Sequence, residues 1–347
     1  MKKIKTGIAS FGMSGRVFHA PFIEANEAFD LTAICERSKN EASKLYPKVQ
    51  VVRSLEELIS IDEIELIIVN TPDTTHYDYC KAALKAGKHV IVEKPFVFSV
   101  SEGEELIELA EKNGLVLTVF QNRRWDGDFL TLQKVLKDNS LGRIVEYRAG
   151  FQRFKNYIVE GSWKEERNRY VGIVYNLGPH LVDQAVCLFG KPEGVFAQIS
   201  CQREGSKVDD YFQINLIYKG LNVLLTASQL MKEPIASFVL NGVNGSFVKY
   251  GVDPQENQLK AGMKPTDIGY GVDKLENYGI LNVEVAGESN RGPVATDPGN
   301  YMLFFDNVAL AIRDNLSPAI SARENLTIIQ ILAAAYQSHE EKKIVFF

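Results

Sequence analysis

The sequence has few of the residues and segments that mark several large classes of protein. Its four cysteines, at positions 35, 80, 187 and 201, form no CxxC pair, and no histidines stand near them at metal-ligand spacing. This argues against a disulfide framework and against a metal site. No apolar run approaches the roughly 20 residues that a membrane-spanning helix needs. With a net charge of −5 and no basic block, the chain lacks the positive field of a nucleic-acid-binding protein.

What is present is the composition of an ordinary globular protein, with 45% hydrophobic and 24% charged residues over 347 positions. That length exceeds the usual size of one hydrophobic core, so two domains are expected. The opening Met1–Lys5 is basic, but Gly7, Ser10 and Gly12 break the apolar stretch behind it, which argues against a secretory signal. We therefore expect a soluble, cytoplasmic protein that binds neither membrane nor nucleic acid.

The N-terminal third alternates short apolar segments with helix-like stretches. The strand candidates are residues 4–9, 31–36, 66–70, 90–93 and 116–120. The helix-like stretches between them include 38–46, 77–86 and 101–113. This alternation predicts an α/β domain with a parallel, doubly wound sheet, which we assign to residues 1–122.

From about residue 143 the pattern changes to strands that follow one another closely, at 143–154, 195–204, 210–218, 222–230, 237–241 and 246–250. They predict an α+β domain over 123–347 with one open, mostly antiparallel sheet. Helices at 173–189, 299–314 and 322–338 should cover a single face, and a capping box of Ser321 and Glu324 opens the last. We expect this C-terminal helix to pack back on the first domain, and 251–295 to be a long surface excursion.

A glycine-rich turn follows the first strand candidate. Ser10-Phe11-Gly12-Met13-Ser14-Gly15 matches GxGxxG except that serine takes the first position. A strand ends just before it and a helix can begin inside it, so backbone N–H groups and the helix dipole would bind a pyrophosphate. Alone the motif could be an ordinary tight turn, but the surrounding alternation favours a dinucleotide site at Ser10, Phe11, Gly12 and Gly15.

The end of the second strand candidate leaves the choice of nicotinamide cofactor open. Glu36 stands where an acid accepts hydrogen bonds from the adenosine ribose, which favours NAD. Arg37, Ser38 and Lys39 follow and could hold a 2′-phosphate while Glu36 turns away, which favours NADP. Arg37 and Lys39 could also belong to a solvated helix start. We slightly prefer NADP and keep NAD as the alternative.

A lysine follows the strand candidate at 90–93. Strand ends at this edge of a parallel sheet face the ligand crevice, so Lys94 of Glu93-Lys94-Pro95 is expected to point at the nicotinamide. The bond between Lys94 and Pro95 could be cis.

A second reacting group lies on a predicted helix. Asn176, His180 and Asp183 are spaced i, i+4 and i+7 and would share one helix face. A polar stripe with a single histidine is ordinarily interpreted as a solvent-facing helix surface. Its occurrence together with the other motifs favours a functional role.

These motifs resemble the glucose–fructose oxidoreductase / inositol dehydrogenase / rhizopine catabolism (Gfo/Idh/MocA) family, in order and over essentially the whole chain. Two further stretches carry the likeness, Asn70-Thr71-Pro72-Asp73-Thr74-Thr75-His76 and Asn122-Arg123-Arg124-Trp125. Residues 15–21 (Gly-Arg-Val-Phe-His-Ala-Pro), 121–129 and 208–212 (Val-Asp-Asp-Tyr-Phe) look most like the branch that contains NADP-dependent scyllo-inositol dehydrogenases.

The resemblance implies an N-terminal Rossmann domain and a C-terminal sheet that binds a small polyol or sugar and packs in a homodimer or homotetramer. It implies reversible oxidation of a secondary hydroxyl, best guessed as that of scyllo-inositol, by hydride transfer to the nicotinamide. His180 would take the hydroxyl proton and Lys94 would stabilise charge developing on the oxygen. The family's third catalytic residue, an aspartate, falls on Asn176, which can orient a hydroxyl but cannot act as a base.

The resemblance also places further residues, more loosely. It puts Thr71, Pro72, His76, Glu93, Trp163 and Lys164 at the cofactor, and Arg123 and Tyr157 with Asn176 and His180 at the substrate. For each of the looser matches a packing or surface role is at least as good an interpretation.

Two other functions remain open on the same fold. One is a non-catalytic regulator that senses NAD(P) or a sugar, to which Asn176 gives some weight. The other is a redox-neutral enzyme whose hydride transfer is transient. Retention of both Lys94 and His180 favours the dehydrogenase, because a pure sensor has no use for a proton-transfer pair.

Overall fold

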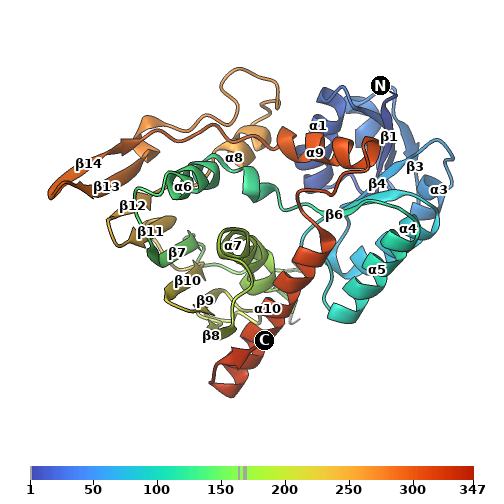
Figure 1. Cartoon of the computed structure of the whole chain (residues 1–347). Coiled ribbons are helices and arrows are strands. Elements are labelled where there is room, and N and C mark those ends of the chain that lie inside the picture. Colours follow the sequence, from blue (N-terminus) through green and yellow to red (C-terminus); the bar gives the residue numbers. More distant parts are fainter. Residues whose placement is uncertain (1, 163–164, 167–169) are drawn as a thin grey trace. The chain divides into compact units, whose positions relative to one another are not determined.

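The structure, a computed structural model, describes residues 2–162, 165–166 and 170–347. The chain divides into two compact units (Figure 1). Unit 1 comprises Met1–Trp125, Gln255–Tyr270 and Asn300–Ile329, and unit 2 comprises Asp126–Pro254, Gly271–Gly299 and Gln330–Phe347. Two returning segments therefore complete the first unit, whereas the sequence suggested one break after residue 122. Over the described residues, no helix is long and apolar enough to span a membrane.

The sheet of unit 1 contains six strands over the described residues, all parallel, in the order β3-β2-β1-β4-β5-β6. They are β1 (Ile4–Ile8), β2 (Phe29–Cys35), β3 (Gln50–Val52), β4 (Leu66–Val69), β5 (His89–Val92) and β6 (Leu117–Val119). The strand order reverses between β1 and β4, which opens a ligand crevice at the carboxyl ends of the strands. The predicted doubly wound sheet is confirmed, and β3 is an addition too short to show a periodic pattern.

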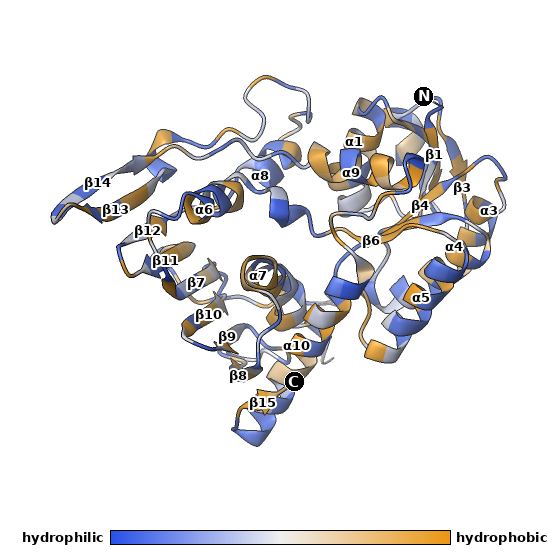
Figure 2. Ribbon diagram, viewed as in Figure 1, coloured by the Kyte–Doolittle hydropathy of each residue, from blue (hydrophilic) through white to orange (hydrophobic). Residues whose placement is uncertain are grey.

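Helices cover both faces of this sheet, so its strands are apolar on both sides (Figure 2). The connecting helices are α1 (Ala20–Ala25), α2 (Glu41–Leu45), α3 (Leu55–Ile59), α4 (His76–Lys85) and α5 (Val100–Lys112). The returning segments add α8 (Gln255–Lys260), α9 (Met302–Arg313) and the first part of α10 (Ala322–Glu341). Phe305 of α9 stacks on Phe22 of α1 at 5.3 Å between ring centres, and Leu326 of α10 lies in the same core.

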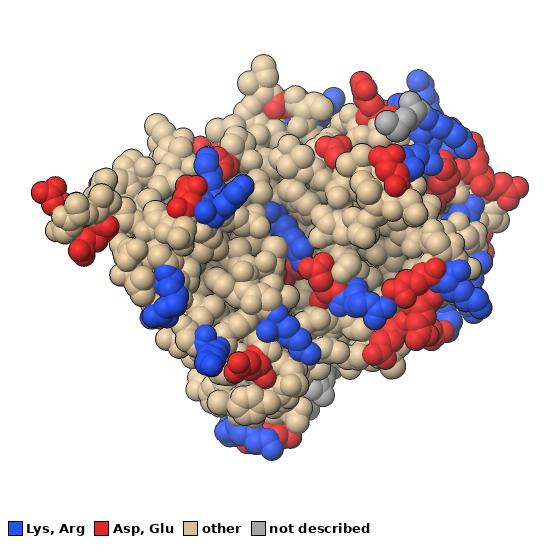
Figure 3. Space-filling view, in the orientation of Figure 1, with Lys and Arg blue, Asp and Glu red and all other residues tan. Residues whose placement is uncertain are grey.

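Two details of unit 1 follow from its sequence. Ser321 Oγ accepts the Glu324 N–H at 3.1 Å and Glu324 Oε2 accepts the Ser321 N–H at 3.2 Å, so the capping box is confirmed. In the region of α4 and α5, acidic side chains gather in one patch and basic side chains lie beside it (Figure 3), and Lys81 pairs with Glu105 at 2.5 Å.

The sheet of unit 2 contains nine strands over the described residues, in the order β14-β13-β12-β11-β7-β10-β9-β8-β15. They are β7 (Ile144–Gln152), β8 (Gly194–Ser200), β9 (Tyr211–Tyr218), β10 (Leu221–Ser228), β11 (Phe238–Gly242), β12 (Gly245–Lys249), β13 (Gly279–Val285), β14 (Glu288–Val294) and β15 (Val345–Phe346). All six expected strands are present. Neighbouring strands are antiparallel except β7 and β10, which run parallel, so the sheet is mixed.

The expectation of an irregular excursion over 251–295 is wrong. This segment contains α8 and the β13–β14 hairpin, and β13 pairs with β12 to extend the sheet. Every residue of β14 is exposed or half-buried. The strand therefore has no buried face and no apolar alternation, and it tolerates Pro293 because it lies at a sheet edge.

Helices α6 (Gly127–Lys137), α7 (Ile173–Phe189) and the end of α10 lie on one side of the unit 2 sheet (Figure 1). Side chains of β9 that face them, such as Phe212 and Ile214, are buried, while Gln213 and Asn215 on the other side are half-buried. The sheet thus has one helix-covered face and one open face, as expected. The helix expected at 299–314 does not cover it, because α9 belongs to unit 1.

Candidate functional site

The glycine-rich turn follows β1 and leads directly into a helical segment over residues 13–25. A Cβ at Gly15 would lie 2.2 Å from the Ser10 carbonyl oxygen, so only glycine allows this close packing, and Asn70 Nδ2 donates to the same oxygen at 2.8 Å. A Cβ at Gly12 would meet nothing nearer than Ser10 Oγ at 3.7 Å. Phe11 is buried in the core. The open side of Gly12 and the first N–H groups of the helix fit a pyrophosphate.

The Glu36 side chain turns inward at the end of β2. It is 6% exposed, and its two carboxylate oxygens accept the backbone N–H groups of Glu41 at 3.2 Å and Ala42 at 2.9 Å, at the start of α2. Arg37 and Ser38, which follow it, are exposed. The carboxylate is therefore engaged by its own chain.

Arg53, which the sequence analysis did not single out, braces this turn from the end of β3. Its guanidinium donates to the backbone oxygens of Glu36 at 2.8 Å and Lys39 at 2.7 Å, and to Asn40 Oδ1 at 2.6 Å. The turn backbone is fixed while the side chains of Ser38 and Lys39 remain exposed.

The loop after β4 is tied to the loop after β5 through His76. The His76 ring is fully buried, with Nδ1 2.8 Å from the Pro95 oxygen and Nε2 3.1 Å from the Thr71 oxygen. The Thr71 hydroxyl is hydrogen-bonded to Thr75 at 2.6 Å, and Pro72 is exposed. The buried His76 therefore connects the two loops and is not available to a ligand. Thr71 and Pro72 remain the candidates at the crevice.

Lys94 is the second residue after β5, at the same edge as the turn after β1, and it is half-buried. Its bond to Pro95 is cis. Glu93, the residue before it, directs its carboxylate at the glycine-rich turn, where Ser14 Oγ and His19 Nε2 both contact Oε1. The His19 distance is 2.9 Å.

Local helix geometry explains why Ser14 and His19 reach one oxygen. Side chains five positions apart point about 140° apart on an α-helix. Here Gly15–His19 form a π-helical turn, closed by the Ala20 N–H donating to the Gly15 oxygen, and this wider turn brings positions 14 and 19 to the same side. Hydrophobic periodicity could not reveal this, although both residues lie in or beside motifs quoted for the resemblance.

The Glu93 carboxylate stays ionised in this setting. Burial alone would raise its pKa, but the hydrogen bond and charge of His19, the Ser14 hydroxyl and the positive charge of Lys94 together lower the pKa below its ordinary value. An ionised carboxylate only accepts hydrogen bonds, so His19 Nε2 carries the hydrogen. The Lys94 ammonium thus has a fixed negative charge beside it.

In unit 2, Asn176, His180 and Asp183 lie on α7 as predicted. The stripe is not a solvent-facing one, because His180 is 6% and Asp183 1% exposed, while Asn176 is exposed. A Cβ at Gly178 would lie 3.0 Å from the Leu332 side chain of α10, so α7 packs closely there. The structure therefore buries most of the His180 side chain and leaves the Asn176 side chain accessible.

The looser candidates have different surroundings. Arg123 is buried in unit 1 and pairs with Glu256 of α8 at 2.7 Å. Tyr157 in unit 2 is 59% exposed. Trp163 and Lys164 lie outside the described residues.

Comparison with known proteins places both halves of the chain in one family. Residues 4–121 match the model of the Gfo/Idh/MocA oxidoreductase family's NAD-binding Rossmann fold, and residues 133–346 match that of its C-terminal alpha/beta domain. A Bacteroides fragilis protein of known crystal structure is 47% identical, with a TM-score of 0.92 and full coverage of both chains.

Two relatives match nearly the whole chain. The uncharacterized oxidoreductase C115.03 of Schizosaccharomyces pombe is 41% identical over 99% of this chain and 100% of its own length. The scyllo-inositol 2-dehydrogenase (NADP(+)) IolW of Bacillus subtilis is 35% identical over 99% of this chain and 95% of its own length. From the two matched family domains and these full-length relatives, we conclude that the chain belongs to the Gfo/Idh/MocA oxidoreductase family.

Proposed function

We propose that this oxidoreductase reversibly oxidises a secondary hydroxyl of a cyclitol or sugar, with scyllo-inositol as the first candidate. The observation that carries the proposal is Lys94, a cation held beside an ionised Glu93 at the same sheet edge as the dinucleotide turn. The name of the IolW relative supports the substrate class. Retention of Lys94 and His180 favours this activity over a regulator.

The residues would divide the chemistry between them. A bound nicotinamide supplies the hydride acceptor at its C4 position. Lys94 donates a hydrogen bond to the substrate oxygen and stabilises the negative charge that develops there. His180 takes the hydroxyl proton, because an imidazole titrates near neutrality, and returns it in the reverse direction. Asn176 orients a substrate hydroxyl through its amide.

We propose NADP rather than NAD as the cofactor, because the Glu36 carboxylate is already hydrogen-bonded within the protein. Both of its oxygens accept helix N–H groups, so binding a ribose diol would break these bonds. The exposed Arg37, Ser38 and Lys39 offer a guanidinium, a hydroxyl and an ammonium to a 2′-phosphate.

The cofactor proposal is tested by the double variant Arg37→Ala/Lys39→Ala. We expect kcat/KM for NADP to fall on the order of a hundredfold, with NAD changed about twofold, because each charge-assisted bond contributes roughly 1.5–3 kcal/mol. Lys48→Ala, which removes another exposed lysine beyond α2, is the matched control. Equal losses with both cofactors would contradict the proposal.

The activity itself is tested by following reduced-nicotinamide absorbance with inositols, aldoses and sugar acids, each paired with NADP and with NAD. We expect turnover with at least one cyclitol or sugar, and its loss in Lys94→Ala. Tight cofactor binding without turnover on any compound would instead favour a regulator. Substrate conversion without net change in absorbance would favour a redox-neutral cycle.

We also propose that two or four copies associate through the open face of the unit 2 sheet. Leu224 on β10 and Val239 on β11 are half-buried on this face, among polar neighbours such as Gln213. Leu224→Lys should lower the mass in solution to that of a smaller species, measured by light scattering. An unchanged mass, or a monomeric wild type, would remove this proposal.

A further inference from the structure

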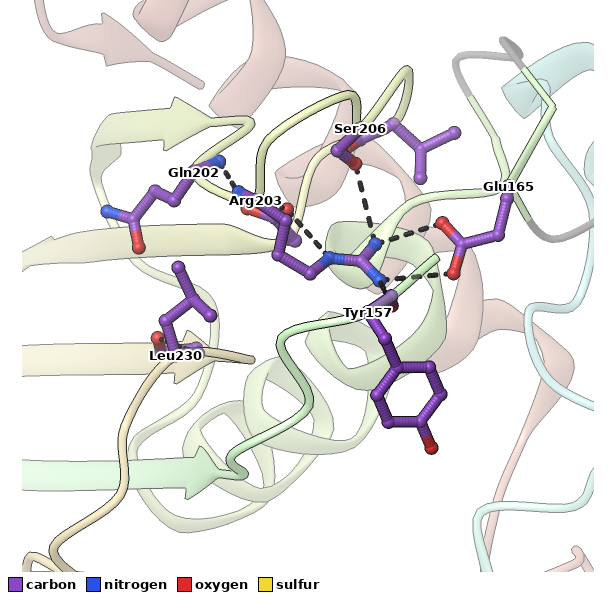
Figure 4. Close-up of polar contacts among 9 residues, drawn as sticks. Tyr157, Glu165, Gln202, Arg203, Ser206 and Leu230 are labelled. Atoms are coloured by element: carbon purple, nitrogen blue, oxygen red, sulfur yellow. Dashed lines mark hydrogen bonds and ion pairs between the residues drawn. The ribbon is translucent and has the colours of Figure 1, made fainter. Parts of the chain in front are cut away.

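A buried arginine closes a loop in unit 2. Arg203, between β8 and β9, has a side chain that is 1% exposed (Figure 4). Burying a guanidinium costs free energy unless its N–H groups find acceptors. All five N–H groups of the Arg203 guanidinium donate a hydrogen bond. The acceptors are Asp210 Oδ2 at 3.0 Å, the Tyr157 oxygen at 2.8 Å, Glu165 Oε1 at 3.1 Å and Oε2 at 2.9 Å, and Ser206 Oγ at 3.4 Å.

Two of these acceptors stand at opposite ends of one segment. Tyr157 begins the segment 157–165 and Glu165 ends it, and the same guanidinium holds both. The bond to Tyr157 is made to its backbone oxygen, which leaves its ring directed away from Arg203 (Figure 4) and 59% exposed. Arg203 therefore fixes where the segment starts and ends while the Tyr157 side chain stays accessible.

The anchor for Arg203 comes from the Val-Asp-Asp-Tyr-Phe motif. Asp210 is fully buried, and its carboxylate accepts the backbone N–H groups of Gln202 at 2.6 Å and Arg203 at 3.0 Å as well as Arg203 Nε. Asp210 thus fixes both the backbone and the side chain of Arg203.

The preceding aspartate fixes α7. Asp209 Oδ2 accepts the Val174 N–H at 2.8 Å, and Oδ1 accepts the Tyr336 hydroxyl at 2.7 Å. A Cβ at Gly172, the residue before α7, would lie 1.9 Å from this carboxylate, so glycine is required there. Two adjacent carboxylates therefore hold the helix that carries His180 and, through Arg203, the segment that begins at Tyr157.

We propose that Arg203 is a positioning residue that holds Tyr157 and Glu165 in place relative to α7 and thereby sets the affinity for the polyol substrate. The inference rests on the proposed function, in which His180 takes the hydroxyl proton, and on the expectation from the family resemblance that Tyr157 lies at the substrate. Arg203 touches neither substrate nor cofactor in this account. It acts through the place it gives to Tyr157.

The kinetic test uses Arg203→Met and Arg203→Lys with scyllo-inositol and NADP. We expect Arg203→Met to raise KM for the polyol at least about tenfold and to leave KM for NADP within about twofold. The substitution removes only the hydrogen bonds that the Arg203 side chain makes within unit 2. Arg203→Lys should reverse less than half of the rise in log KM for the polyol, because a lysine cannot bind Glu165 bidentately. Arg323→Met removes an exposed ion pair with Glu111 and should change neither constant.

A second measurement needs no turnover. Amide hydrogen exchange of the peptide that spans 157–162 should be about tenfold faster in Arg203→Met and in Glu165→Gln, with α5 unchanged. Should Arg203→Met fail to fold, Glu165→Gln carries both measurements, because it leaves the pair of Arg203 with Asp210 intact.

The outcomes separate the two proposals. Faster exchange in Arg203→Met, in a protein that turns over no polyol, would contradict the proposed function but support the positioning role of Arg203. Unchanged exchange, or faster exchange with an unchanged polyol KM in an active enzyme, would overturn the positioning role. Equal rises in both KM values would assign Arg203 to general stability instead.

Discussion

His19 Nε2 lies 2.9 Å from Glu93 Oε1, in a contact that joins the fully buried His19 ring of the first helical segment to the end of β5. The His19 ring also packs on Phe120 at 4.5 Å between ring centres. This contact, with that of Ser14, joins the dinucleotide turn to the residue beside Lys94. The geometry of the glycine-rich turn and that of Lys94 are therefore coupled within unit 1.

Removal of this contact should affect both stability and catalysis. We expect His19→Ala to lower the free energy of unfolding by about 3 kcal/mol, since it deletes a bond to a buried charge and leaves a cavity. We also expect kcat to fall on the order of tenfold, because His19 no longer holds Glu93 in place beside Lys94. Denaturant unfolding and steady-state kinetics measure the two effects. His19→Gln retains a donor and should recover part of each, and a wild-type kcat in His19→Ala would refute the coupling.

The stability contributed by Glu93 should depend on pH with a defined sign. The folded protein lowers the pKa of this carboxyl below its ordinary value of 4.5, so the ionised form stabilises the fold. The contribution is complete above that value and is lost as pH falls through the lower, folded pKa. The difference in unfolding free energy between wild type and Glu93→Gln should therefore shrink as pH drops below 4.5. Glu104→Gln, at an exposed position of α5, is the control, and a constant difference across this range would contradict the assignment.

The two glycines of the turn should respond in opposite ways. Gly15→Ala places a Cβ 2.2 Å from the Ser10 oxygen, so it should destabilise the fold by roughly 1–3 kcal/mol. Gly12→Ala meets no protein atom within 3.4 Å, so stability should stay within about 0.5 kcal/mol while NADP binding weakens. Thermal unfolding and titration of NADPH fluorescence separate the effects. Tight NADPH binding by Gly12→Ala would remove Gly12 from the cofactor site.

Much of the fold was predictable because its elements carry strong local signals. The buried parallel strands are continuous apolar runs, and Ser321 and Glu324 marked the start of α10. The β13–β14 hairpin was missed because β14 buries no face, and β3 because three residues show no period. The returning segments of unit 1 could not be foreseen, since their assignment depends on tertiary packing such as that of Phe305 on Phe22.

The candidate site was predictable where chemistry follows a strand end. Glu36 is the first residue after β2 and Lys94 the second after β5, where parallel strands bring their side chains to one edge. The inward turn of the Glu36 carboxylate depends on the backbone N–H groups of α2, which residue types do not encode. Arg203 was also missed, because its acceptors are scattered over residues 157–210 and become neighbours only in the folded unit.

Asn176 offers a test of the missing family aspartate. Asn176→Asp places a negative charge one helical turn before His180 at an exposed position, so the fold should tolerate it. An anion favours the imidazolium, so the pH–rate profile should move upward by about one pH unit. Asn176→Ala distinguishes the new charge from loss of the amide. A profile identical in wild type and Asn176→Asp would show that position 176 does not act on the proton-transfer group.

In the reaction that we propose, a hydride passes between a substrate carbinol carbon and the nicotinamide, with Lys94 at the oxygen. The most direct test supplies a polyol deuterated at its reacting carbon with NADP and analyses the reduced cofactor by mass spectrometry. We predict deuterium at C4 of the nicotinamide with the wild type, and its loss in Lys94→Ala under conditions where NADPH still binds. Reduced cofactor without deuterium, or equal labelling by Lys94→Ala, would contradict the account.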